Sequence, residues 1–242
     1  AINGTKKVVD YLTKRKEKID FCIVGEPTNP NKLGEMIKIG RRGSLSGKIE
    51  ITGTQGHIAY PHLSNNPINT LVAICKKLKE NKLDNGNKNF QPSNLEFTSI
   101  NVDNKAHNVI PARAKAKFNI RYNNLHTSSS LKKKVSLVVK KISKKNKCKY
   151  KIDYMANGEA FLTKPEKTVL LAKKIIRKIT KINPKLSTTG GTSDARFIRK
   201  IAPCLEFGLV NKTMHRVDEC VSLIDLKKLT KIYNNILVEY FK

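Results

Sequence analysis

Several short segments of the sequence concentrate ionisable or hydroxyl side chains where a buried core would not need them. In the first of these segments, Glu26 follows directly after an apolar run at residues 20–25. Such a run predicts a strand covered on both faces, and open α/β sheets bind ligands at the ends of such strands. Burying a lone carboxylate is costly, so Glu26 should have a cation or a metal as its partner. The alternative is a carboxylate that lies exposed in a loop.

Two histidines, His57 and His215, lie in predicted loop or turn segments, where their side chains could take part in chemistry. His57 belongs to a glycine-rich stretch at residues 53–62, and His215 lies in a predicted loop before the last helix. A neutral histidine can donate to a developing oxyanion or bind a metal. Asp218 and Glu219 could orient His215 as hydrogen-bond partners. The alternatives are a structural histidine in a turn for His57 and an unremarkable exposed histidine for His215.

Cationic and amide side chains form a third group. Lys38, Arg41 and Arg121 suit the capture of a carboxylate, which arginine can bind with two parallel hydrogen bonds. Any one of them is more often a surface cation, and Asn108 is by default a turn residue. The glycines and hydroxyls of residues 189–197 would let a backbone approach an anion closely, or they could cap a helix.

The apolar periodicity predicts the elements that must position these residues. We expect helices at 5–13, from Asn66-Pro67 onward, at 131–142, 165–179 and 222–241, and strands at 20–25, 45–53, 95–102, 112–122, 150–154 and 202–208. The order strand, helix, strand, strand, helix, strand between 43 and 157 is a ferredoxin-like α+β pattern. The sequence therefore predicts an α/β protein: a parallel-sheet domain at 1–42, an inserted domain at 43–157, and a return to the first domain at 158–242.

Composition narrows the class of protein. The formal net charge is +29, but the lysines are spread along the chain and few aromatic residues alternate with them, which favours a solvated face over a nucleic-acid site. No apolar run is long enough for a membrane span, and the first residues lack a signal sequence. The five cysteines are widely spaced, as is typical of reduced thiols. We therefore expect a cytoplasmic protein that binds neither nucleic acid nor membrane.

Taken in order, these segments resemble the bacterial succinyl-diaminopimelate desuccinylases, a family of the two-zinc aminoacylase and carboxypeptidase clan. The resemblance runs over essentially the whole chain. Its strongest stretches are VGEPT at 24–28, GRRGSLSG at 40–47, GHIAYPH at 56–62, NVIPA at 108–112, FNIRY at 118–122, FLTKP at 161–165, GGTSDARF at 190–197 and MHRVDECV at 214–221.

The resemblance implies a fold, an activity and a role for each matching residue. The fold would be part of a zinc-peptidase-like catalytic domain with an inserted ferredoxin-like lid, through which the protein forms a homodimer. The activity would be hydrolysis of N-succinyl-LL-2,6-diaminopimelate to succinate and LL-2,6-diaminopimelate, on the route to lysine. Glu26 and His215 would each bind one of two zinc ions, for which cobalt is an alternative. His57 would reach into the partner's active site and donate to the oxyanion. The residues that would hold the substrate are Lys38, Arg41, Tyr60, Asn108, Arg121, Gly191, Thr192 and Ser193.

Two departures from the family pattern matter. Position 107 is His where the family has a second Asn beside Asn108. The family's other zinc ligands and its general base have no counterpart in this chain, so we expect the chain alone to bind zinc poorly and not to turn over. Two other functions remain open: a related deacylase or aminopeptidase of the same clan, and a basic nucleic-acid-binding module.

Overall fold

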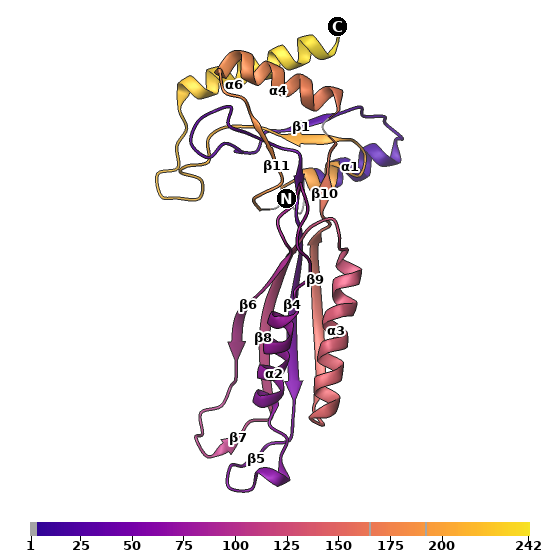
Figure 1. Cartoon of the computed structure of the whole chain (residues 1–242), viewed down its shortest axis with the longest axis vertical. Helices are drawn as coiled ribbons and strands as arrows, with labels where there is room; N and C mark the ends of the chain where they lie inside the picture. The colour runs from indigo at the N-terminus through magenta and orange to yellow at the C-terminus, as the bar shows by residue number, and fades with distance from the viewer. Residues whose placement is uncertain (1–3, 165, 192) are drawn as a thin grey trace. The chain divides into compact units, whose positions relative to one another are not determined.

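The computed structural model describes residues 4–164, 166–191 and 193–242. Its internal contacts divide the chain into two compact units. Unit 1 consists of Ala1–Arg42 with Phe161–Lys242, and unit 2 is Gly43–Ala160, inserted between the two halves of unit 1 (Figure 1). The predicted insertion ended at residue 157, whereas the contacts extend unit 2 to Ala160, because its last strand runs on to Gly158.

Unit 2 is built on an antiparallel sheet in the order β6-β8-β4-β9. Two helices, α2 and α3, pack against each other and against this sheet (Figure 1). This is the strand order of a ferredoxin-like fold, as the alternation of predicted elements indicated. The elements are β4 (Gly43–Thr52), β5 (Gly56–His57), η1 (Pro61–Leu63), α2 (Pro67–Glu80), β6 (Asn94–Asn101), β7 (Val109–Ile110), β8 (Arg113–Tyr122), α3 (Ser128–Lys145) and β9 (Lys149–Gly158).

Local sequence explains where the helices of unit 2 begin. The Asn66 side chain accepts a hydrogen bond from the Ile68 amide at 2.9 Å, and Pro67 occupies the first helical position. Helix α3 is capped by Thr127, whose side chain and that of Ser130 each bond to the other residue's backbone. The apolar pattern placed the start of α3 too late, because its first turn consists of serines.

The carboxylate of Asp84 joins the loop after α2 to the loop between β8 and α3 by hydrogen bonds. Asp84 accepts hydrogen bonds from the Gly86 and Ser93 amides, from Asn123 Nδ2 at 2.6 Å, and forms a pair with His126 Nε2 at 3.0 Å. Burial opposes the charged form of Asp84. The hydrogen bonds from Ser93, Gly86 and Asn123 outweigh burial and lower the pKa of Asp84 to about 2.

This cluster predicts an acid-dependent loss of stability. Because the folded-state pKa of Asp84 lies below its usual 3.8, its charge stabilises the folded protein above pH 4, and this contribution is lost as the pH falls towards 2. We expect Asp84→Asn to lower the free energy of unfolding by about 2 kcal/mol at pH 7. Urea unfolding at pH 7 and pH 3 measures this. A difference between variant and wild type that is equally large at both pH values would contradict it.

Unit 1 contains a sheet in the order β1-β12-β2-β11. The pairs β1–β12 and β11–β2 are parallel, but β12 and β2 run antiparallel, so the predicted parallel sheet is in fact mixed. The short strands β2, β3, β10 and β11 were not predicted, since they are too brief for a periodic pattern. The elements are α1 (Thr5–Lys14), β1 (Cys22–Val24), β2 (Met36–Lys38), β3 (Gly40–Arg41), β10 (Phe161–Leu162), α4 (Lys167–Thr180), β11 (Lys185–Ser187), α5 (Ala195–Ile198), β12 (Cys204–Glu206) and α6 (Leu223–Tyr240).

The core of unit 1 lies between this sheet and two helices. Helices α4 and α6 lie side by side (Figure 1), and their buried residues Ile176 and Ile232 pack in one cluster with Ile37 of β2 and Phe207 after β12. In the part of the chain that the structure describes, none of the helices combines the length and the apolar character needed to span a bilayer.

Candidate active site

The end of β1 carries Glu26 to the same sheet edge as the end of β12. The two strands are parallel neighbours, with Val24 opposite Glu206. Hydrogen bonds continue to join the segments that follow these two strands. The Phe207 amide donates to Val24 O at 3.0 Å, Asn29 Nδ2 donates to Gly208 O at 2.6 Å, and the Asn211 amide donates to Asn29 O at 2.9 Å. The loop that contains His215 therefore leaves the sheet from the edge at which Glu26 lies.

Gly208 is needed for this close approach of backbones. A Cβ atom at position 208 would fall well inside van der Waals distance of the Glu26 and Gly25 carbonyl oxygens. Only glycine lets the chain after β12 pass so close to Glu26.

The surroundings of Glu26 disfavour its negative charge. Burial, and then the nearby carboxylate of Glu206, raise the pKa of Glu26, while Arg41 partly opposes them and Asp194 adds to them. A cation bound beside Glu26 would reverse this effect, since it would stabilise the charged carboxylate.

His215 is exposed and lies in the left-handed region, with φ at 62°. Its backbone amide donates to Glu219 Oε2 at 3.1 Å, so Glu219 orders the loop through the backbone and not through the imidazole. The described contacts do not join the His215 ring to Glu26, and the meeting of these two side chains at a metal stays a prediction.

Glu26 and His215 offer the donor types that zinc binds, a carboxylate and an imidazole. A catalytic zinc takes about three protein ligands. Within residues 4–164, 166–191 and 193–242, no group of three or more His, Cys, Asp or Glu side chains could hold a metal ion. The residues described here therefore do not complete a zinc site by themselves.

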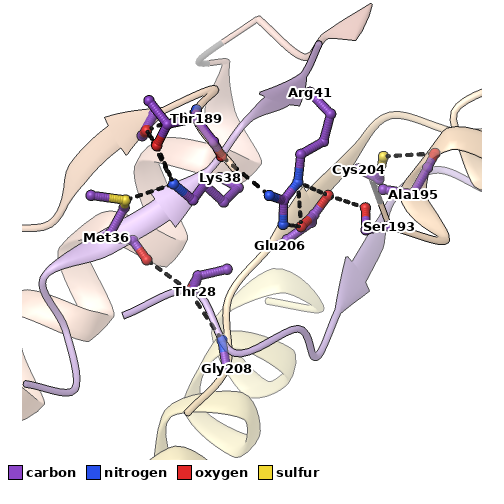
Figure 2. A network of polar contacts seen from close by, with 11 residues as sticks. Thr28, Met36, Lys38, Arg41, Thr189, Ser193, Ala195, Cys204, Glu206 and Gly208 are labelled. Atoms are coloured by element: carbon purple, nitrogen blue, oxygen red, sulfur yellow. Dashed lines mark hydrogen bonds and ion pairs between the residues drawn. The ribbon is translucent and has the colours of Figure 1, made fainter. Parts of the chain in front are cut away.

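A buried polar cluster of unit 1 is centred on a residue that sequence reasoning missed, Glu206 (Figure 2). Glu206 is almost fully buried at the end of β12. Its carboxylate accepts hydrogen bonds from Arg41 Nε at 3.0 Å and also pairs with Arg41 Nη2. The Ser193 hydroxyl donates to the same carboxylate. Arg41 Nη1 donates to the Thr189 carbonyl at 3.1 Å, which brings two predicted substrate-binding residues, Arg41 and Ser193, into one network.

Lys38 lies beside this network with a different set of partners. Its Nζ atom donates to Thr189 Oγ1 at 2.7 Å, to Ser187 Oγ at 3.3 Å and to Met36 Sδ at 2.8 Å, all of which are neutral groups (Figure 2). Burial, and then the charge of Arg41, lower the pKa of Lys38 to about 8. An ammonium held by neutral groups is well suited to bind an anion.

Gly190 and Gly191 differ sharply in their environment. Gly190 has a φ of 105°, and a Cβ atom there would collide with the Arg41 guanidinium. Gly191 is exposed, and a Cβ atom there would meet nothing. Thr192, predicted to line the same pocket, lies outside the described residues.

Alanine substitution should change the free energy of unfolding at position 190 but hardly at position 191. We expect Gly190→Ala to lower the free energy of unfolding by about 1–3 kcal/mol, because it forces an alanine into the left-handed region and displaces Arg41. The matched control, Gly191→Ala, should change it little. Urea unfolding of both variants checks this, and equal losses would show that Arg41 does not require glycine at 190.

In unit 2, three predicted residues gather around a short ribbon. His57 of β5 pairs with Val109 of β7, the Ile58 amide donates to the Asn108 carbonyl at 3.0 Å, and the ring of Tyr60 lies 6.0 Å from that of His57. All three predicted side chains are exposed. The Ala59 amide donates to His57 Nδ1 at 3.1 Å, so the neutral ring carries its proton on Nε2 and presents a donor to solvent.

Arg121 lies apart from this group. The ribbon adjoins the Arg113 end of β8, while Arg121 is near the opposite end, opposite Ser44 of β4. At about 3.3 Å per residue, the strand from Arg113 to Arg121 is about 26 Å long. Unit 2 of one subunit therefore does not bring His57, Tyr60 and Asn108 to the same place as Arg121.

Glu206 is the site residue that sequence reasoning missed, whereas Thr189 was already part of the segment 189–197. The available signal was an acidic residue inside the apolar run at 202–208, which a buried strand tolerates only if the charge is paired. Its partner, Arg41, lies 165 residues earlier in the chain, and nothing in the local pattern links the two.

Comparison with known proteins first identifies the fold. Residues 39–147 match the M20 peptidase dimerisation domain. The fold resembles that of aminopeptidase PepT from Bacillus cereus, with a TM-score of 0.82 at 16% identity over 99% of this chain and 62% of that one. It also resembles an M20 family metallo-carboxypeptidase from Sulfolobus solfataricus, with a TM-score of 0.71 at 17% identity over 95% of this chain and 66% of that one. The chain thus has the mixed α/β fold of the M20 peptidases, with their dimerisation domain inserted.

Among curated proteins, the chain resembles the succinyl-diaminopimelate desuccinylases along its whole length. It is 68% identical over 241 residues to the enzyme of Pelagibacter ubique and 50% identical over 242 residues to that of Methylobacterium radiotolerans. The chain spans 63% and 62% of the lengths of these two relatives. The resemblance predicted from the sequence motifs is confirmed.

Proposed function

We propose that this chain is part of a succinyl-diaminopimelate desuccinylase, which hydrolyses N-succinyl-LL-2,6-diaminopimelate to succinate and LL-2,6-diaminopimelate. The observation that carries this proposal is 68% identity, over the whole chain, to a relative of that name. The polar cluster of unit 1 supports it, because Lys38 and Arg41 lie together at a sheet edge where an anionic acyl group could bind.

The residues of this chain would have distinct tasks. Lys38 would bind a substrate carboxylate, since its present partners are neutral. Glu26 and His215 would each contribute one ligand to a pair of divalent metal ions, zinc or cobalt. Bound there, such ions would lower the pKa of a water molecule enough to provide hydroxide, the nucleophile that attacks an amide. His57 would donate from Nε2 to the oxygen of the amide carbonyl as it gains charge.

The position of His57 favours a homodimer. His57, Tyr60 and Asn108 lie at one end of unit 2, and Arg121 lies near the other. All four can serve one substrate if the first group belongs to the partner subunit. The match of residues 39–147 to a dimerisation domain supports this arrangement. The proposed activity would place the protein in the cytoplasm, on the route to diaminopimelate and lysine.

A second candidate function is an aminopeptidase or a related amino-acid deacylase. The observation that favours it is the fold of unit 1 and unit 2, which also occurs in an aminopeptidase. The two functions differ in what the cationic cluster must bind. A desuccinylase needs a cation for the free carboxylate of the succinyl group, whereas an acetyl group has no such carboxylate.

The deciding experiment uses a full-length subunit, in which this sequence is completed to the length of its relatives. It is assayed with zinc on succinyl-diaminopimelate, on an acetylated analogue and on a tripeptide. Preferential cleavage of the succinyl substrate would support the proposal, and preferential cleavage of the tripeptide would replace it by the second candidate. We expect the present chain alone, with added zinc, to show no turnover. Robust activity of the chain alone would contradict the ligand assignment.

A further inference from the structure

We propose that Glu206 is a positioning residue, whose carboxylate fixes Arg41 and the loop containing Ser193 in one arrangement. This inference rests on the proposed function only in so far as Arg41 and Ser193 bind substrate. The geometry itself concerns three segments of unit 1: strand β3, the loop after β11, and the end of strand β12.

The contacts of Glu206 account for both of its oxygens. Oε1 accepts from Arg41 Nε and from the Ser193 hydroxyl, and Oε2 accepts from Arg41 Nε and Nη2 (Figure 2). The side chain of Glu206 is only 2% exposed and that of Arg41 10%. A carboxylate this buried would destabilise the fold if its partners were absent, so its orientation and theirs depend on each other.

Arg41 also contacts the loop after β11 directly, without Glu206. Arg41 Nη1 donates to the Thr189 carbonyl at 3.1 Å, and Gly190 leaves just enough room for that guanidinium. The loop is therefore held to Arg41 directly at Thr189 and through Glu206 at Ser193. Loss of the Glu206 charge would release the guanidinium and the loop together.

This arrangement also limits what Arg41 can do. Nε and Nη2 of its guanidinium already face an internal carboxylate, and Nη1 faces a carbonyl oxygen. Most of the charge of Arg41 is thus neutralised within the protein. Arg41 would meet a substrate as an oriented hydrogen-bond donor more than as a free cation, which leaves Lys38 as the less compensated positive group of the cluster.

The first test needs no enzymatic activity. In ¹H–¹⁵N spectra of this chain, the Arg41 Nε–H signal is identified as the one absent from Arg41→Lys. Glu206→Gln should shift it and speed its exchange with water, since the ion pair is lost. Ser193→Ala, which removes only one hydrogen bond, should shift it by a smaller amount, and this variant keeps the test decisive if Glu206→Gln fails to fold. Ser136→Ala removes a hydroxyl that bonds to Tyr154 in unit 2 and should leave the signal unchanged. If neither Glu206→Gln nor Ser193→Ala changes the chemical shift or the exchange rate of the Arg41 Nε–H signal, the proposal is overturned.

The second test uses the full-length subunit and separates KM from kcat. Glu206→Gln should raise KM for the succinyl substrate by about 10–100-fold, by analogy with the loss of hydrogen-bond partners of metal ligands, and change kcat less. The double variant with Arg41→Ala should have nearly the KM of Arg41→Ala alone, because both changes disable the same group. Fully multiplicative effects would contradict action through Arg41. If the wild-type subunit does not cleave the succinyl substrate, the proposed function fails, while the spectroscopic result still decides the role of Glu206.

Discussion

Mixing two inactive variants of the full-length subunit, His57→Ala and Glu26→Gln, is expected to restore about a quarter of the wild-type activity. The reason is that His57 lies about 26 Å, the length of β8, from the Arg121 end of its own unit and would serve the partner's site. In a mixed dimer, the subunit that keeps Glu26 is paired with the subunit that keeps His57. One of its two sites is then complete.

Each variant alone should be nearly inactive. His57→Ala removes a donor to the oxyanion and should lower kcat by about 10²–10³-fold with little change in KM. Random pairing on co-expression makes about half of the dimers mixed, which gives the expected quarter, and mixed dimers isolated through two different affinity tags should reach about half of the wild-type activity. A mixture that stays inactive would show that His57 acts within its own subunit, because both sites of a mixed dimer would then carry one defect.

Replacing Glu26 by glutamine in the full-length subunit should lower activity by about 10³-fold or more, since a lost metal ligand forfeits several kcal/mol of charge stabilisation. The charge of Glu26 is already disfavoured by burial and by Glu206, so a bound cation is what would keep this carboxylate ionised. Metal content after dialysis, measured by elemental analysis, should fall by about one ion per subunit. Unchanged metal content together with unchanged activity would remove Glu26 from the site.

Two glycines beside Glu26 provide a matched pair for the same measurement. Gly208→Ala would push against the Glu26 carbonyl and should reduce metal content and activity without changing any ligand. Gly25→Ala adds a Cβ atom that makes only an ordinary contact, 3.5 Å from the Tyr233 hydroxyl. It should leave both nearly unchanged. Equal effects of the two substitutions would mean that the backbone of Glu26 is not held by the chain after β12.

The elements that sequence predicted well are those with long apolar patterns or clear caps. The alternation of Ala114, Ala116, Phe118 and Ile120 predicted β8, and Asn66-Pro67 marked the first turn of α2. The strands of two or three residues in unit 1 escaped prediction, because their existence depends on pairing with distant segments. The antiparallel contact between β12 and β2 is of this kind: it rests on Glu206 lying opposite Lys38, which no local pattern reveals.

The candidate site was predictable in its residue types but not in its partnerships. The motifs singled out Lys38, Arg41 and Ser193, and the structure places all three within one cluster. Which of these charges is neutralised internally, and by which residue, depends on burial and on a contact across 165 residues of chain. The resemblance to a family supplied the roles of Glu26 and His215, which stay predictions.

The discontinuity of unit 1 has a consequence for how the protein is made. The strands of unit 2 pair within Gly43–Ala160, so that unit can fold as soon as this stretch has left the ribosome. Strands β1 and β2 must wait for β11 and β12, and Arg41 remains without its carboxylate until then. During synthesis, the apolar residues of β1 and the charge of Arg41 are exposed together. A Glu206 variant passes through this interval like the wild type, because residue 206 has not yet been made. It differs only afterwards, when Arg41 stays without its carboxylate in the finished chain.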